Sequence, residues 1–524
     1  MRVIVIVMSL SRRSFLLGAA GLAAAGLPGA ATPARPRFAS DPFTLGVASG
    51  YPLPDGVVLW TRLAPDSLHG GGLPPAEVEV AWEIAADPHF RTIVRRGTEF
   101  TQPEWAHSVH AEVHGLEPDR WYFYRFHSGG AVSPSGRTRT APQPGAVPER
   151  LRFAFASCQQ YEQGYYGAYR HMAAEDLDLV LYLGDYIYES SWGRHHVRSH
   201  GAEEPLTLED YRNRYALYKS DADLQAAHAA FPWIVTWDDH EVQNDYAADR
   251  SQFAAPRDEF LARRTAAYRA YYEHMPLPHS MRPDGTGMRI YTRRDYGALA
   301  RIHVLDDRQY RDYQACPRLE RGGGSNVVPL AYCRELLRPE RTLLGAAQER
   351  WLEDGLAASG ARWNVIAQQT VMAQVDRWPG EGSSYWTDGW DGYPRARERL
   401  LGFLAAKRTA NPVVIGGDVH TAIVADLKTD FNDPQAPVVA TEFVSTSITS
   451  QGISQKALDT WSAENSHLRY VNGTRRGYTT MELTAKHARV RMRAVYEKVP
   501  RSPVRTQSAW VVEDGRPGAQ MESV

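Results

Sequence analysis

The chain has 524 residues, which is too long for one ordinary hydrophobic core and favours two or three domains. Hydrophobic residues make up 43% and charged residues 23%, as in a typical soluble globular protein. The net charge is −2, so bulk charge gives no reason to expect binding to a membrane surface or to a nucleic acid. A nucleic acid could still be a substrate.

The first residues carry a targeting pattern. Arg12 and Arg13 form an arginine pair, and an apolar run rich in Ala and Gly follows to about Gly26. This pattern predicts a Tat signal peptide over residues 1–34, with cleavage near Ala34. The run is short and Pro28 interrupts it, so no stable membrane anchor is expected. We therefore expect the Tat export machinery as a partner and a periplasmic or secreted location, although a chance arginine pair stays an alternative.

The remaining chain divides into three further parts. Residues 40–140 read as short strands separated by turns at steady spacing, which predicts a small antiparallel β-sandwich of immunoglobulin or fibronectin type. Residues 150–500 alternate buried strand runs with helical stretches, which predicts an α/β domain. Residues 501–524 are rich in Arg, Pro, Gly and Ser and are expected to form an extended or disordered tail.

Three cysteines bear on the chemistry. In an oxidising compartment, Cys316 and Cys333 could form a bridge across the Gly-rich loop between them. Cys158 would then be an unpaired thiol in an exported protein. Ligation of a metal is one role that would explain its presence.

Apolar runs of the α/β domain end repeatedly in polar residues. Taken alone, an aspartate after a strand is usually a helix cap or a turn residue. Together the endings are more informative, because parallel strands place their carboxyl ends on one edge of a sheet, where ligands bind. The residues that follow the six runs are Ser157 and Cys158, Gly184–Glu189, Asp238–Glu241 with Asn244, Asp306–Arg308, Gln368 and Gln369, and Gly416–His420.

These endings supply two unlike sets of metal ligands. Tyr188 follows Asp185 by three residues, and a phenol ligates well only when a strong Lewis acid such as ferric iron removes its proton. Cys158 and His420 would complete a mixed set of sulfur, oxygen and nitrogen ligands. The other set offers only oxygens, which favours a hard divalent ion such as calcium, magnesium or manganese. Its members are Asp239, Asn244 and Asp418.

Two adjacent cations of this kind would clamp a phosphate and activate water. His240 could then protonate the leaving group or hold a phosphate oxygen, although a structural histidine is an open alternative. Arg308, Arg395 and Arg397 are candidates for binding phosphate, which arginine grips with two hydrogen bonds. For each arginine, a surface ion pair is an equally open alternative.

In these motifs the chain resembles the PhoD family of alkaline phosphatases and phosphodiesterases, which are relatives of the purple acid phosphatases. The resemblance spans nearly the whole mature chain in order. Its motifs are Gly46–Gly50, Val57–Arg62, Ala156–Cys158, Gly184–Tyr188, Trp237–Glu241 with Asn244, Leu305–Arg311, Trp390–Tyr393, Gly417–His420 and Glu442–Ser447.

The resemblance implies more than spacing does. It implies a fibronectin- or immunoglobulin-like β-sandwich followed by a four-layer αββα metallophosphoesterase domain. It also implies Fe³⁺ held by residues matching Cys158, Asp185, Tyr188 and His420, and Ca²⁺ held by residues matching Asp239, Asn244 and Asp418. By the register of the family motif, His240 falls on the catalytic histidine. With Arg308 and Arg397, which the chemistry of arginine suggests, it makes up the expected set of catalytic residues.

Three functions stay open at this stage. The first is hydrolysis of phosphate monoesters and diesters. The second is a specialised diesterase of phospholipase D-like or nuclease-like kind, which would use the same metals. The third is an exported binding module with no catalytic activity.

Overall fold

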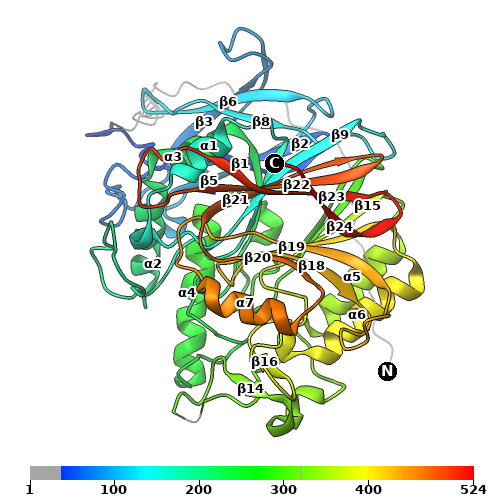
Figure 1. Ribbon diagram of the computed structural model, residues 1–524. Helices are drawn as coiled ribbons and strands as arrows, with labels where there is room; N and C mark the ends of the chain where they lie inside the picture. Colours follow the sequence, from blue (N-terminus) through cyan, green and yellow to red (C-terminus); the bar gives the residue numbers. More distant parts are fainter. Residues whose placement is uncertain (1–36, 319) are drawn as a thin grey trace, which may run out of the picture.

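Two large sheets dominate the computed structural model, which describes residues 37–318 and 320–524 (Figure 1). The predicted signal peptide therefore lies outside the described residues. The ten-stranded sheet has a parallel centre of β9 (Arg150–Ala156), β10 (Leu179–Leu183), β11 (Pro232–Thr236) and β1 (Val47–Leu53). Antiparallel strands extend it on both sides: β2 (Gly56–Arg62) and β5 (Ser108–Val113) beyond β1, and β21 (Arg476–Thr484), β22 (His487–Val495), β23 (Arg505–Glu513) and β24 (Arg516–Glu522) beyond β9.

The seven-stranded sheet also has a parallel centre. That centre is β13 (Ala300–Val304), β15 (Trp363–Ala367), β17 (Pro412–Gly416) and β19 (Val438–Val444). Antiparallel strands flank it: β12 (Thr292–Tyr296) on one side, and β18 (Ala422–Lys428) and β20 (Leu468–Asn472) on the other.

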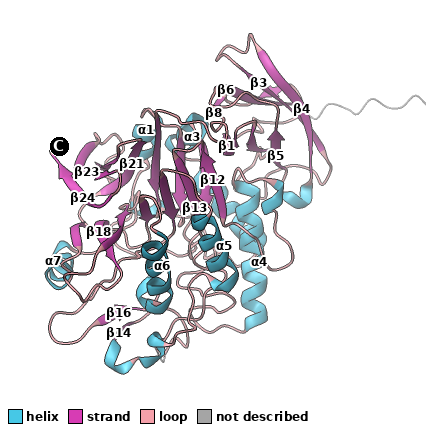
Figure 2. Ribbon diagram, turned by 90° about the vertical axis from the view of Figure 1, so that its right-hand side faces the viewer, coloured by secondary structure: helices cyan, strands magenta, loops and turns pink. Residues whose placement is uncertain are grey.

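Side chains of the seven-stranded sheet alternate between two cores. Val365 and Ala367 of β15 join the core that contains Phe153 and Leu181 of the ten-stranded sheet. Ile366, between them, joins a second core with Leu352 of α5 (Gly345–Ala357) and Leu401 of α6 (Pro394–Lys407). Because successive residues of a strand face opposite sides, the two sheets pack face to face, and α5 and α6 cover the outer face of the smaller one (Figure 2).

Further helices surround the two sheets. α1 (Gly167–Ala173) contacts β21, β22 and α3, and α3 (Ala222–Ala230) contacts β1. The paired helices α2 (Leu208–Lys219) and α4 (Arg257–His274) run beside them, and α7 (Gln455–Glu464) packs on β20. The mixed α/β class expected from the sequence is confirmed. In the described part of the chain, the search for membrane-crossing helices finds none that is long and apolar enough.

The N-terminal strands form two packed layers, and one of these layers is part of the ten-stranded sheet. β3 (Val78–Ala85), β4 (Ile93–Thr101), β6 (Trp121–Ser128), β7 (Ala131–Val132) and β8 (Gly136–Arg139) make a small sheet that projects from one corner of the molecule (Figure 2). It packs on β1, β2 and β5 through a shared apolar core. Those three strands continue the ten-stranded sheet, since β1 pairs in parallel with β11. The sheet thus crosses the boundary expected near residue 140, which strand patterns alone cannot reveal.

The prediction of an extended or disordered tail at 501–524 is corrected. The segment forms β23 and β24, a hairpin that extends the ten-stranded sheet. Ser508, Trp510 and Val512 are buried at alternate positions of β23, which anchors the hairpin. Composition concealed this alternation, because Arg, Pro and Gly occupy the turn and the exposed face.

A disulfide joins Cys316 and Cys333, as the sequence suggested. The loop that it closes carries β14 (Val327–Pro329), which pairs with β16 (Ser384–Trp386) to make a two-stranded sheet.

Candidate active site

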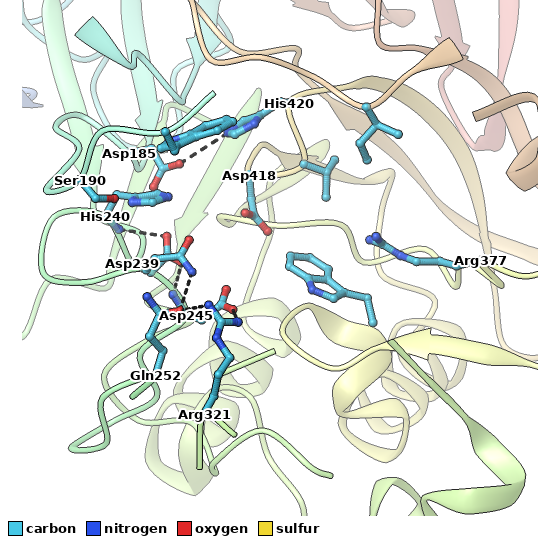
Figure 3. A pocket seen from close by; sticks show the side chains of 15 residues that line it. Asp185, Ser190, Asp239, His240, Asp245, Gln252, Arg321, Arg377, Asp418 and His420 are labelled. Atoms are coloured by element: carbon cyan, nitrogen blue, oxygen red, sulfur yellow. Dashed lines mark hydrogen bonds and ion pairs between the residues drawn. The ribbon is translucent and has the colours of Figure 1, made fainter. Parts of the chain in front are cut away.

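One cavity of about 460 Å³ lies where the strand ends meet (Figure 3). The residues after β10, β11 and β17 reach it from both large sheets. They place six predicted site residues in its wall: Asp185, Asp239, His240, Asn244, Asp418 and His420. Asp245, which follows Asn244 in the chain, lines it as well.

The backbone is strained where these side chains leave their strands. Cys158, Asp185, Asp418 and His420 have φ angles of 61°, 57°, 65° and 53°. Residues other than glycine adopt this left-handed region rarely, and such positions gather at functional sites. Asp185, Asp418 and His420 line the cavity, and Cys158 lies beside Asp185 and His420.

Four donor groups of the predicted iron site converge. Ligand atoms of Cys158, Asp185 and His420 all lie within 4.8 Å of one another. The Tyr188 hydroxyl donates to Asp185 Oδ2 at 2.7 Å and lies 3.1 Å from His420 Nε2. His420 Nδ1 lies 2.9 Å from the Gln451 carbonyl oxygen, so a proton on Nδ1 leaves the Nε2 lone pair for a ligand.

The electrostatics of this group suit a cation. Burial raises the pKa of Cys158, of Asp185 and of Tyr188 well above their ordinary values, and the charge of Asp185 adds to the effect on the other two. Burial, together with Arg476 and His240, lowers the pKa of His420 to about 3, so the imidazole is neutral. Among the described residues, Asp185 Oδ1 has no hydrogen-bond partner. A metal ion would stabilise each of these groups in its ligating form.

The oxygen set is less compact. Asp239 groups with Asp185 and His240, whereas Asp418 lines the same cavity but joins none of the compact ligand groups found among the described residues. Asp418 Oδ2 accepts from the Thr370 hydroxyl at 2.6 Å. The side-chain amide of Asn244 donates to Gln252 at 3.0 Å, which leaves its oxygen available. All three predicted oxygen ligands thus share one cavity.

Glu189 is a functional residue to which sequence reasoning gave no role. Its Oε2 lies 2.6 Å from His240 Nδ1, and its Oε1 accepts the backbone N–H of Asn244 at 2.8 Å. Burial opposes the charge on His240, but Glu189, Asp185 and Asp239 outweigh it and raise the pKa of His240 well above its usual value. Glu189 follows Tyr188 directly in the segment after β10, and this position was the available signal in the sequence.

Glu241 joins two of the strand-end loops. Its carboxylate accepts backbone N–H groups from Asp185 at 3.1 Å, Tyr186 at 2.5 Å and Asp238 at 2.8 Å. These hydrogen bonds, made by a fully buried carboxylate, fix the loops after β10 and β11 relative to each other. This accounts for a residue that the sequence placed only within a motif.

Arg308 does not line the cavity. It is fully buried and forms ion pairs with Asp238, with Asp239 at 3.4 Å and with Asp388 at 2.8 Å. Arg308 therefore holds carboxylates beneath the site, which corrects the expectation that it grips phosphate. The Asp239, Asp245 and Asp388 carboxylates form a third compact group, and Arg308 already supplies it with a positive charge.

The structure also keeps Arg395 and Arg397 away from the cavity. Both line a separate hollow, where Arg397 pairs with Asp391 and Arg395 pairs with Glu398. The expectation that they bind the substrate phosphate is corrected, because these carboxylates already occupy them. Two arginines that the sequence did not single out, Arg321 and Arg377, line the active-site cavity instead.

Comparison with known proteins identifies the family of the chain. The model of the PhoD-like phosphatase family matches residues 153–492, and the model of the PhoD-like phosphatase N-terminal domain matches residues 29–142. The chain is 48% identical over 499 residues to alkaline phosphatase D of Bacillus subtilis (strain 168), which covers 94% of this chain and 84% of that protein. A solved structure of PhoD superimposes with a TM-score of 0.89 at 47% identity and covers 93% of each chain.

These matches set aside the alternative of a binding module without activity. The chain belongs to the PhoD-like phosphatase family and is a phosphoric ester hydrolase.

Proposed function

We propose that the protein is an exported alkaline phosphatase and phosphodiesterase, which hydrolyses phosphate monoesters and diesters at a centre of Fe³⁺ and Ca²⁺. The convergence of thiol, carboxyl, phenol and imidazole at Cys158, Asp185, Tyr188 and His420 carries the proposal. A mixed set of this kind suits ferric iron, whereas the oxygens of Asp239, Asn244 and Asp418 suit calcium. Asp185 belongs to two of the ligand groups, so it would bridge the two ions.

The bound ions would supply positive charge to the phosphate oxygens and make a water molecule acidic enough to attack. The protein's own part is to place the groups around the phosphate. Glu189 holds His240 Nδ1, so the proton on Nε2 is free to pass to the leaving oxygen. Arg308 holds the carboxylates in place, and Glu241 holds the loops. Such positioning matters because catalysis of phosphoryl transfer depends mainly on the placement of groups and charges around the phosphate.

Export by the Tat pathway is part of the proposal. The arginine pair at Arg12 and Arg13 supports it, because a twin arginine is the signal of that pathway. The pathway carries folded proteins, so the metals could be loaded before export. The expected location is the periplasm or the medium.

Hydrolysis of p-nitrophenyl phosphate and of its bis-ester tests the reaction. We expect turnover of both by protein purified after its own export, and reversible loss of activity when calcium is chelated. Absence of turnover of both esters would contradict the proposal. A strong preference for the bis-ester would instead favour the specialised diesterase.

The colour of the protein tests the iron assignment independently of activity. Tyrosinate bound to Fe³⁺ absorbs visible light, so we expect a coloured protein and loss of the band in Tyr188→Phe. A colourless protein that is fully active and free of iron would refute this part of the proposal.

A further inference from the structure

The active-site cavity has a cationic wall opposite its acidic one. Asp185, Asp239 and His240 lie on one side, Arg377 lies across the cavity from them with Asp418 between, and its guanidinium points inward (Figure 3). The scissile phosphate is expected at the acidic side, where the ligand groups converge. Arg377 therefore faces the part of a substrate that departs.

Arg377 forms no ion pair with any residue that the structure describes. Among the described residues, its side chain makes no ion pair or hydrogen bond, and its buried Nε lacks an acceptor. The second cation of the cavity differs, because Arg321 lies 3.7 Å from Asp245 and donates to Gln252 at 2.6 Å. A guanidinium whose buried Nε lacks an acceptor is costly, and an anion in the cavity would reduce that cost.

Two indole rings hold the guanidinium in place. The Arg377 guanidinium carbon lies 4.8 Å from the Trp386 ring centroid and 4.4 Å from that of Trp461. Trp386 also lines the cavity, while Trp461 belongs to α7 behind it. Stacking on both rings fixes the plane of the guanidinium, so its free N–H groups are already oriented toward a ligand.

The backbone that carries Arg377 is fixed as well. The Asn465 side chain accepts the backbone N–H of Asp376 at 2.9 Å and donates to its carbonyl oxygen at 2.9 Å. The Asp376 carboxylate in turn accepts the backbone N–H of Ser384 at 2.8 Å. The segment is thus tied to α7 and to β16, and the cation is presented on a rigid support.

We propose that Arg377 and Trp386 form a leaving-group subsite, which favours phosphate esters whose leaving group carries an anionic group of its own. A carboxylate or a second phosphate would accept two N–H groups of Arg377 while the apolar body of the leaving group packs on Trp386. The inference rests on the proposed phosphatase function and names its substrate class.

A pair of matched substrates tests the subsite. 4-Carboxyphenyl phosphate and 4-carbamoylphenyl phosphate have nearly equal size, but only the first has an anionic leaving group. The measured quantity is the ratio of their kcat/KM values, compared between the wild type and Arg377→Met, so that the intrinsic reactivity of the two esters cancels. One charge-assisted pair corresponds to a ratio about tenfold higher in the wild type than in the variant.

Further variants keep the test sharp. Arg377→Lys retains the charge without the planar fork, so we expect an intermediate ratio, and it serves if Arg377→Met does not fold. Arg338 is exposed and lies outside the cavity, so Arg338→Met should keep the wild-type ratio. An equal ratio in the wild type and in the Arg377 variants would overturn the inference. Absence of turnover of both esters by the wild type would instead overturn the proposed function.

Discussion

The disulfide between Cys316 and Cys333 supports one wall of the active site, and its removal should weaken substrate binding. The loop that it closes contains Ser325, which donates to Asp245 through its backbone N–H at 3.0 Å and its hydroxyl at 2.6 Å. The same loop contains Arg321 of the cavity wall, and its β14 pairs with β16, which carries Trp386. We therefore expect the double variant Cys316→Ala/Cys333→Ala to have a higher KM, with a smaller change in kcat.

The size of the effect follows from loop closure. The two cysteines are 17 residues apart. A cross-link over a loop of this length lowers the entropy of the opened loop, and so raises the free energy of opening by about 3 kcal/mol. Without it, the population of the locally opened loop should rise about a hundredfold. Because proteolysis of an opening segment tracks that population, cleavage by trypsin at Arg318 and Arg321 should accelerate by a similar factor.

Limited proteolysis and steady-state kinetics on the same samples provide the assay. Reduced wild-type protein is the matched control, since it lacks the bridge but keeps both sulfur atoms. It should resemble the double variant, and the variant itself should not respond to reductant. If oxidised and reduced wild-type protein were cleaved equally fast and shared one KM, the bridge would have no part in shaping the cavity.

Other side chains of the site and core give further tests. Glu189→Gln should lower kcat by about 10- to 100-fold with little change in KM, because Glu189 orients His240, and an unchanged kcat would contradict that role. Arg308→Met should cost about 3–5 kcal/mol of unfolding free energy in urea, since it leaves buried carboxylates unpaired; an Arg308 that bound phosphate would affect KM instead. Burial lowers the pKa of Lys219 from 10.5 to about 7, so the folded protein loses this proton first and gains stability as pH rises from 7 to 10.5. Relative to Lys219→Met, the wild type should be roughly 2–3 kcal/mol more stable at pH 9.5 than at pH 7.5, and parallel pH dependences of the two proteins would contradict the lowered pKa of Lys219.

Part of the site could be predicted from parallel strand ends. Cys158 and Asp185 follow the parallel neighbours β9 and β10, so they share one sheet edge whatever the connecting loops do. His420 follows β17 of the other sheet, and only the face-to-face packing of the two sheets brings it to them. The same reasoning could not distinguish Arg308 from a substrate-binding residue. Arg308 also follows a strand, but its side chain turns beneath the site to meet Asp238 and Asp388.

Residues on loops were beyond prediction. Arg377 and Arg321 reach the cavity through packing on Trp461 and through the disulfide-closed loop, and both depend on contacts between segments far apart in the chain. The hairpin at the C-terminus was missed for a related reason. Its strands are stabilised by an existing sheet edge at β22, and a sequence pattern does not say which edges are free.

The site combines backbone strain with crowded acidic groups, and metal binding would relieve the electrostatic cost of the second. Cys158, Asp185 and Asp418 have left-handed backbone angles, and burial also raises the pKa of each. Backbone strain of this kind costs about 1–3 kcal/mol at each position, and crowded acids add to it. The fold tolerates both because Glu241 and Arg308 fix the loops from below. A cation would turn the crowded acids from a cost into a set of ligands, so the strained arrangement is best understood as a site built in advance for metal, and metal binding should stabilise the whole fold.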